Sequence, residues 1–449
     1  MSDMEAELDA VDAGRHAVES DRTPAPMTAP IPVPSLRQIW SIPSVRALML
    51  VQLFWSIGAM AQFTALGKFV IDVTNRNLNL AFLGLAEFVP TAVLVLVSGT
   101  VVDRFDRRKV AGIGMVGEVL CAMALFLYIR TGPTAMWPIF VIVAGVGTTR
   151  AFVSPATRSM KPLVAKPNEF SRVAALFSIS WQSAAIFGPA AAGFLYAAHR
   201  ALPFAVTMTL YSLSIVSLFF VRFRIPQRRS TDDNQKVSVS HALQGLKFIR
   251  RSPVLLGAIS LDLMAVLFGG AVALLPSIAK NQLHVGDIAY GWLRAAPGVG
   301  AVIIGLILVV KPFRRHVGRN LLLAVGVFGV ATVALGLTHS YVVAFAALIV
   351  LSGADMISVY VRSTVVPLST PNEMQGRVSS VENVFIGASN ELGAFESGVA
   401  SSIFGLTPAV AGGGVITVAV AVMWAVFFPS LRSADRFEDV AAEANPQPH

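Results

Sequence analysis

Residues 99–109 read Gly-Thr-Val-Val-Asp-Arg-Phe-Asp-Arg-Arg-Lys, a short polar stretch between two long apolar runs. The flanking runs, residues 80–102 and 110–130, are each long enough to cross a bilayer as a helix. The connection carries four basic side chains, which are Arg104, Arg107, Arg108 and Lys109. Short loops rich in Lys and Arg stay in the cytoplasm, so this stretch predicts two membrane helices and their orientation.

The composition is also that of a membrane protein. Of 449 residues, 55% are hydrophobic and 14% are charged, whereas a soluble domain has about 25% charged residues. The formal charge of +9 would suit a nucleic-acid-binding protein, but such proteins gather their basic residues on a soluble face. Here these residues fall almost entirely in short gaps between apolar runs, so we expect a lipid bilayer around the protein and no nucleic acid.

Twelve apolar runs are long enough to span the membrane, and an even number of spans places both termini on one side. The predicted outer loops hold only four basic residues, Arg76, Arg130, Arg200 and Lys280, while the inner loops hold many more. The positive-inside rule therefore predicts a multi-pass protein with both termini in the cytoplasm. The twelve spans are 45–70, 80–102, 110–130, 135–157, 171–196, 202–221, 254–279, 287–310, 320–338, 340–362, 375–403 and 408–429.

Three polar segments lie outside the predicted helix bundles. Residues 1–42, with a Pro-rich stretch, and residues 431–449 are expected to be disordered cytoplasmic tails. Within the linker, residues 238–250 can form an amphipathic helix on the inner membrane surface. The predicted division is a six-helix bundle at 43–222, a cytoplasmic linker at 223–252 and a second six-helix bundle at 253–430.

The two predicted bundles share a repeated sequence pattern. Arg-Ser at 158–159 and Pro-Asn-Glu at 167–169 both recur 204 positions later. After one inserted residue, Arg-Val and two glycines recur at an offset of 205. A collinear set of matches indicates two halves in the same orientation, related by an axis along the membrane normal.

The pattern Gly-x-x-x-Asp-Arg-x-x-Arg-Arg at residues 99–108 resembles the signature loop between helices 2 and 3 of the major facilitator superfamily of transporters. Residues 144–164 and 371–398 resemble the enterobactin-exporter-like branch, which is related to drug:proton antiporters. The resemblance implies an all-α membrane protein with 12 transmembrane helices in two six-helix halves, related by a pseudo-two-fold axis. We also expect a monomer.

Helix 5 carries a variant of a motif found in drug antiporters, Gly-Pro-x-x-Gly-Gly. Residues 188–193 read Gly-Pro-Ala-Ala-Ala-Gly, with Ala in place of the first Gly of the closing pair. Small residues at this spacing still allow close helix packing, and Pro189 interrupts the backbone hydrogen-bond ladder. We expect six residues of helices 5 and 11 to serve in helix packing and gating: Gly188, Pro189, Gly193, Gly393, Glu396 and Gly398.

The chain lacks the sequence signs of an enzyme or of a cofactor site. It contains no Gly-x-x-x-x-Gly-Lys-Ser/Thr loop for ATP, and its single cysteine, Cys121, lies in an apolar run. The seven histidines form no cluster with metal-ligand spacing. We therefore expect no cofactor, no metal and no catalytic residues, and energy from an ion gradient or from the substrate gradient.

Charged side chains inside the predicted spans cost at least a few kcal/mol each, which makes them candidates for function. In the resembled fold, helices 1, 4, 7 and 10 line the cavity, which implies that Arg150, Asp262 and Asp355 face it. Asp355 aligns next to Arg150 in the repeat, so the two can meet across the axis, either as a static pair or in coupling or substrate binding. The charges are Glu87, Glu118, Arg150, Asp262, Arg294, Asp355, Glu382, Glu391 and Glu396.

Roles follow from where these residues lie along the helices. Proton coupling is expected at Asp262, Glu87 or Asp355, while the alternative for Asp262 is burial beside an Arg from another helix. Glu118 lies on a supporting helix and suits a helix-packing hydrogen bond. Aromatic residues suit either a greasy cavity or lipid-facing packing. The substrate-cavity candidates are Arg150, Arg294, Phe54, Trp55 and Phe268.

The loop at residues 99–109 also suggests a conformational latch that holds the outward-open state. Gly99 would let helix 2 approach helix 11, where Asp103 would accept hydrogen bonds from the helix N-terminus, because the helix dipole is positive there. Arg104 and Arg107 would pair with acids such as Asp106 or Glu169. The expected latch residues are Gly99, Asp103, Arg104, Arg107 and Arg108.

These observations favour a secondary active transporter of the bacterial cytoplasmic (inner) membrane. It would export a small amphipathic organic molecule, such as a drug, siderophore or metabolite, by alternating access driven by protons. Two alternatives stay open: a lipid or lysophospholipid translocator of the same fold, and a membrane sensor or scaffold that transports nothing. A scaffold has no need of costly membrane charges, which weighs against the last.

Overall fold

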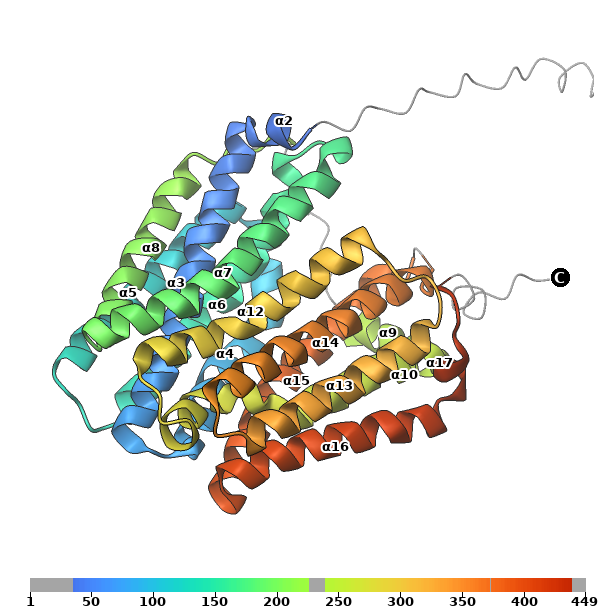
Figure 1. Ribbon diagram of the computed structural model, residues 1–449. Helices are drawn as coiled ribbons and strands as arrows, with labels where there is room; N and C mark the ends of the chain where they lie inside the picture. Colours follow the sequence, from blue (N-terminus) through green and yellow to red (C-terminus); the bar gives the residue numbers. More distant parts are fainter. Residues whose placement is uncertain (1–34, 226–238, 372, 438–449) are drawn as a thin grey trace, which may run out of the picture.

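The computed structural model describes residues 35–225, 239–371 and 373–437, which form long helices and no strand (Figure 1). Eleven helical segments are long and apolar enough to cross a membrane, so the predicted all-helical membrane architecture is confirmed. Ten of them belong to single helices: α3 (Pro43–Thr74), α4 (Asn77–Arg104), α5 (Arg107–Arg130), α6 (Trp137–Val164), α7 (Phe170–Ala198), α8 (Leu202–Phe219), α12 (Asp287–Val310), α13 (Val317–Leu337), α14 (Tyr341–Leu368) and α16 (Leu406–Phe427).

The remaining apolar segment, Pro253–Gln282, is a broken rod rather than one helix. Helix α10 (Pro253–Phe268) is followed by a 3-10 turn (Gly270–Leu274), the short α11 (Leu275–Ser277) and a π turn (Ile278–Gln282). The break coincides with two glycines in tight surroundings, and a methyl group at Gly269 would lie 2.3 Å from the ring of Phe328 on α13. A methyl group at Gly270 would lie 2.5 Å from the carbonyl oxygen of Gly393, and only glycine leaves room for that approach.

A twelfth long helix, α15 (Gln375–Phe404), corresponds to the predicted eleventh span but is not counted among the apolar ones. Its 30 residues include Glu382, Glu391 and Glu396 as well as several serines. It nevertheless packs against α4 and α10, inside the bundle. A polar helix in this place is tolerated because neighbouring helices, and not lipid, cover much of it.

The long helices form two groups that differ in their packing partners. In the amino-terminal helix group, α3 packs on α7 and α8, and α6 packs on α4 and α5. In the carboxy-terminal helix group, α14 packs on α12 and α13, and α16 packs on α13 and α10. The groups meet where α7 crosses α12 and where α4 crosses α15. Figure 1 shows them close together at one end and diverging toward the end where α2 and α17 lie.

Small residues permit both crossings between the groups. A methyl group on Gly193 of α7 would lie 2.8 Å from the Cα of Gly291 on α12. One on Gly398 of α15 would lie 2.6 Å from the Cβ of Ala81 on α4. Side-chain contacts between the groups lie around these crossings. We call this region the closed end; it comprises residues 63–87, 185–196, 272–298 and 391–401.

Some of the expected tail and linker residues are structured. Ser35 and Gln38 form a capping box for α2 (Leu36–Trp40), so the expectation of disorder up to residue 42 is wrong for this stretch. Helix α17 (Pro429–Ser433) likewise extends into the expected tail and packs on α13. Residues 1–34, 226–238 and 438–449, including most of both tails, lie outside the described residues.

The expected linker helix is present as α9 (Val239–Arg251). It packs along α15, where a methyl group on Gly245 would lie 2.7 Å from the carbonyl oxygen of Arg377. One face of α9 is therefore covered by protein. Its place on the inner membrane surface and the exact domain boundaries stay predictions.

Candidate functional site

The amino-terminal helix group holds a buried cluster of three charged side chains and a tryptophan, contributed by four helices. Arg150 of α6 forms an ion pair with Glu87 of α4, and its Nε lies 3.6 Å from Glu118 Oε1 of α5. Trp55 Nε1 of α3 donates a hydrogen bond of 2.6 Å to the other oxygen of Glu118, whose side chain is fully buried. We call Trp55, Glu87, Glu118 and Arg150 the amino-terminal charge cluster.

A second cluster occupies the carboxy-terminal helix group. Arg362 Nη2 of α14 lies 2.9 Å from Asp262 Oδ1 of α10, and its Nη1 lies 3.9 Å from Glu382 Oε1 of α15. Ser358 donates a hydrogen bond of 3.2 Å to Asp262. Asp355, on α14 two turns before Arg362, is close enough to interact electrostatically with both Asp262 and Arg362. We call Asp262, Asp355, Arg362 and Glu382 the carboxy-terminal charge cluster.

Both clusters contain more carboxylates than arginines. One arginine stands between two carboxylates in the first, and one stands among three in the second. A buried charge is tolerated only when it is paired and hydrogen-bonded. Each cluster therefore has one or more carboxylates that a proton or another cation can neutralise.

The expected meeting of Arg150 and Asp355 is wrong in this conformation. Arg150 is paired within its own helix group, and Asp355 lies with Arg362 in the other. The alternative given for Asp262, burial beside an Arg from another helix, is the arrangement found. Sequence reasoning missed Arg362 because it placed this residue at the end of the tenth span, whereas α14 continues to Leu368 and buries it. The repeat, which aligns Arg158 with Arg362, was the available signal.

A third set of polar residues, also missed, joins the two groups at the closed end. Lys68 of α3 lies 2.6 Å from Asp72 and 3.0 Å from Asp287 of α12. Lys280 donates to the carbonyl oxygen of Ile71 at 2.9 Å and lies 3.8 Å from Asp72 Oδ1. The hydroxyl of Tyr196 donates a hydrogen bond of 2.9 Å to Asp72 Oδ2. Lys68, Asp72, Tyr196, Lys280 and Asp287 form what we call the closed-end network. The position of Lys68 within a predicted span, four residues before Asp72, was the sequence signal.

The other expected cavity residues are Arg294, Phe54 and Phe268. Arg294 Nη1 donates to the carbonyl oxygen of Val272 at 2.7 Å, and its guanidinium lies 5.1 Å from the ring centre of Phe63, at the contact between the groups. Phe54 and Phe268 are half-buried on α3 and α10. Glu391 faces Gly84 at the crossing of α4 and α15, near the amino-terminal charge cluster.

The residues expected to pack or gate lie at helix crossings. A methyl group on Gly188 would lie 2.7 Å from Met60 Cβ, and one on Gly393 would lie 2.5 Å from the carbonyl oxygen of Val266. Pro189 is buried in the interior of α7. Glu396 is half-buried, and Ser397 donates a hydrogen bond of 3.5 Å to it.

The expected latch is not engaged in this conformation. A methyl group added at Gly99 would have no described atom within 4 Å, and Asp103, whose side chain is 59% exposed, lies 4.0 Å from Arg107. Arg107 instead donates to the carbonyl oxygen of Ser159 at 2.8 Å. The latch as a whole stays a prediction about another conformation.

The acids expected beside Arg104 and Arg107 have other partners. Asp106 pairs with Arg108 at 3.1 Å, and Glu169 pairs with Arg224 at 2.7 Å. Burial acts to raise the pKa of Asp106, but hydrogen bonds from the side chain and backbone of Arg108 outweigh it, so the pKa lies below its ordinary value. Asp106 also accepts from the backbone N–H of Arg108 and so caps the start of α5.

Known proteins resemble the chain in sequence and in fold. The uncharacterized MFS-type transporter YfiS of Bacillus subtilis is 26% identical over 61% of this chain, and macrolide efflux protein A of Streptococcus pyogenes is 26% identical over 58%. The chain spans only 62% and 64% of the lengths of these relatives.

Solved structures share the fold over almost the whole chain. A bacterial homologue of the human lysosomal transporter Spinster, in an inward-facing and unoccupied conformation, superposes with a TM-score of 0.66, covering 90% of this chain and 98% of that one at 15% identity. A peptide transporter POT in complex with sulfate superposes with a TM-score of 0.66, covering 90% of this chain and 100% of that one at 13% identity. Residues 36–449 match the transmembrane secretion effector family, and the chain therefore belongs to that family of major facilitator transporters.

Proposed function

We propose that this transporter exports small amphipathic organic molecules from the bacterial cytoplasm by alternating access, driven by protons that enter the cell. The proposal places both termini in the cytoplasm, so the closed end faces outward and the diverging end faces the cytoplasm. The efflux protein among its relatives supports the outward direction. The basic residues of the loop at 103–109 support the orientation.

The surplus of carboxylates in the two buried clusters is the observation that carries this proposal. Glu87 and Glu118 share a single arginine, and three carboxylates surround Arg362. A fully ionised cluster would leave uncompensated negative charge among apolar helices, which is costly. Proton binding from one side and release to the other would remove and restore that charge during the transport cycle.

Alternating access requires contacts that form at only one end at a time. The closed-end network joins α3 with α12 across the groups through Lys68 and Asp287. Asp103 and Gly99, at the opposite end of α4, are not engaged. In the outward-open state the network would separate, and the latch at residues 99–109 would close on α15.

Amphipathic substrates suit a path lined by apolar helices with a few charged groups. Aromatic side chains on both sides of the path, such as Phe54 and Phe268, would contact the apolar part of the molecule. Carboxylates that lack a full complement of arginines would attract a cationic part. Macrolides, named for one relative, and lipophilic cations are therefore the first compounds to test.

The test measures transport and proton movement together in proteoliposomes with an imposed pH gradient. Uphill movement of ethidium or a macrolide, with matching loss of the gradient, is expected for the wild type. Asp262→Asn should abolish uphill movement and leave equilibration down a gradient, because an amide cannot cycle a proton. The matched control is Asp435→Asn, which removes a partly exposed carboxylate outside the long helices.

Two results would contradict the proposal. Uphill transport by Asp262→Asn at the wild-type rate would remove Asp262 from coupling, and the same result for Glu87→Gln and Asp355→Asn would remove coupling by these clusters. Movement of a fluorescent lysophospholipid without any change in proton gradient would instead favour the lipid translocator.

A further inference from the structure

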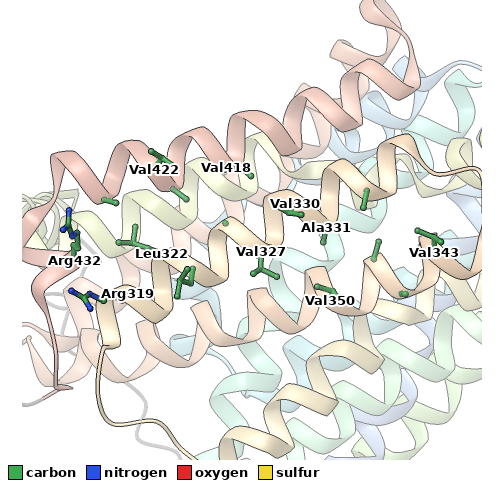
Figure 2. A pocket seen from close by; sticks show the side chains of 17 residues that line it. Arg319, Leu322, Val327, Val330, Ala331, Val343, Val350, Val418, Val422 and Arg432 are labelled. Carbon is green, nitrogen blue, oxygen red and sulfur yellow. The ribbon is translucent and has the colours of Figure 1, made fainter.

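A long apolar groove runs along the outer flank of the carboxy-terminal helix group (Figure 2). Helix α13 forms its floor and α14 and α16 form its sides, with a volume of about 770 Å³. The groove is deep because its lining includes Gly326 and several alanines, while valines such as Val330 and Val422 stand exposed along it. Exposed valines on this flank need an apolar molecule against them.

Two arginines, Arg319 and Arg432, lie together at one end of the groove (Figure 2). Their neighbours hold them there, because Gly318 of α13 touches Leu431 of α17. The N–H of Gly318 donates to the carbonyl oxygen of Ala434 at 3.1 Å, and a methyl group on Gly318 would lie 1.6 Å from the carbonyl oxygen of Leu431. Only glycine permits this approach, so the placement of both arginines depends on it.

Asp435, the described carboxylate nearest to Arg432 in sequence, already has other partners. The backbone N–H of His316 donates to Asp435 at 3.0 Å, and Arg315 lies 3.1 Å from its other oxygen. These hydrogen bonds hold the pKa of Asp435 below its ordinary value. Within residues 35–225, 239–371 and 373–437, neither Arg319 nor Arg432 has a recorded ion pair. The end of the groove is thus a site of uncompensated positive charge.

A second apolar groove of about 470 Å³ adjoins the first. Leu323, Val327 and Val350 line both grooves, so these side chains form the ridge that divides them. The second groove includes Asn320, the residue directly after Arg319. Two apolar channels therefore meet near one cationic point.

The first groove is long enough to hold an acyl chain of one leaflet. Its floor runs along α13 from Arg319 to Ala334, which is about 22 Å at 1.5 Å per residue. One leaflet of a bilayer contributes about 15 Å of hydrocarbon. A chain that enters at the level of the arginines can therefore lie in the groove along its full depth in that leaflet.

We propose that these two grooves bind one anionic diacyl phospholipid of the cytoplasmic leaflet, with its phosphate on Arg319 and Arg432 and one acyl chain in each groove. A second copy of the chain is less suitable, because the paired arginines need a negative group that the apolar walls cannot supply. Guanidinium groups bind phosphate oxygens with charge-assisted hydrogen bonds. The assignment to the cytoplasmic leaflet rests on the proposed function, but the binding of the lipid to the two grooves does not.

Native mass spectrometry of the delipidated full-length protein tests whether the two arginines select an anionic headgroup. Wild type should retain phosphatidylglycerol in preference to phosphatidylcholine of the same acyl chains. Arg319→Gln with Arg432→Gln should weaken retention of phosphatidylglycerol by about 25-fold, or about fivefold for each arginine. The control, Lys311→Gln with Arg314→Gln, removes the same charge from two exposed residues outside the groove and should keep the preference.

A separate variant tests the acyl channel without touching the charge. A side chain at Gly326 meets no described atom within 4 Å of its Cβ, so Gly326→Phe should fill the groove without disturbing the helices and should lower retention of the lipid. Gly412→Phe, at an equally open position away from the groove, should not. Size-exclusion profiles and helix content should match wild type for all four variants.

Three results would overturn the proposal. The first is an unchanged preference for phosphatidylglycerol in the arginine variant. The second is full displacement of the lipid by inorganic phosphate, which would make the arginines a site for free anions. The third is binding that appears only after truncation behind Phe437, which would mean that the acidic residues following it occupy the arginines.

Discussion

Arg362 is the residue whose removal tests the description of the carboxy-terminal charge cluster most directly. Its guanidinium lies 2.9 Å from Asp262 and 3.9 Å from Glu382, which corresponds to about 6 and 4 kcal/mol of attraction at an effective dielectric constant of about 20. The cost of burying the arginine cancels part of this attraction. Removing one partner of a buried pair costs about 3–5 kcal/mol, and we expect this loss for Arg362→Met.

The assay is equilibrium unfolding in mixed micelles of increasing SDS content, followed by far-UV circular dichroism. Arg315→Met is the control, because the Arg315 side chain is 66% exposed and its pair with Asp435 should contribute less than about 1 kcal/mol. Adding Asp262→Asn to Arg362→Met should recover part of the lost stability, since one unpaired carboxylate is then gone. A loss for Arg362→Met no larger than that of the control, or strictly additive losses in the double variant, would refute the pairing.

Other predictions concern the two ends of the helix groups. Asp103→Asn should leave yield and helix content unchanged, because Asp103 is exposed here, but should reduce transport in vesicles; a wild-type rate would remove the latch. Lys68→Met should loosen the closed end, seen as faster labelling of a cysteine introduced near Asp287, and equal labelling rates would contradict this role. Gly398→Val should lower the folded yield, because its Cβ would collide with Ala81, and a normal yield would disprove the close crossing. Asp435 has a lowered pKa, so it stabilises the docking of α17 above its unfolded pKa of about 3.9; this contribution is lost as pH falls through the lower folded value. Hydrogen exchange of α17 should therefore rise on acidification in wild type and show no such step in Asp435→Asn.

The sequence predicts the helices well because their signal is local. A run of about 20 apolar residues is sufficient to define a membrane span, and the predicted run at 287–310 coincides with α12. The helix predicted in the linker, at 238–250, was also found, as α9. Its signal is local, because apolar and charged residues recur at helical spacing within the segment itself. The break at Gly269 and Gly270 was not predicted, since it depends on how closely α13 approaches the first glycine and α15 the second.

Partners of buried charges are harder to predict, because they depend on the rotation of each helix about its axis. The repeat suggested that Arg150 meets Asp355, yet each was found with carboxylates or arginines of its own helix group. Because the tenth span was predicted to end at residue 362, whereas α14 continues to Leu368, Arg362 was placed at a helix end and not in the buried bundle. Which residues are charged and membrane-embedded was largely predictable, whereas which of them touch was not.

The broken rod at Pro253–Gln282 has a mechanical consequence. Its second part is attached to the opposite helix group: Lys280 donates to the carbonyl oxygen of Ile71, and Pro276 touches Gly67 closely enough that a methyl group there would lie 3.2 Å from its ring. Its first part, α10, packs with α15 and α16. The second part is also tied to its own group, because Gln282 donates to the carbonyl oxygens of Gly336 at 2.9 Å and Thr338 at 2.7 Å, at the end of α13. The glycines at 269–270 lie between α10 and these attachments, so α10 would tilt about them while residues 275–282 stay against α3 and the end of α13. The bending of such a tilt would be concentrated in a few backbone dihedral angles and would not be spread along 30 residues of helix.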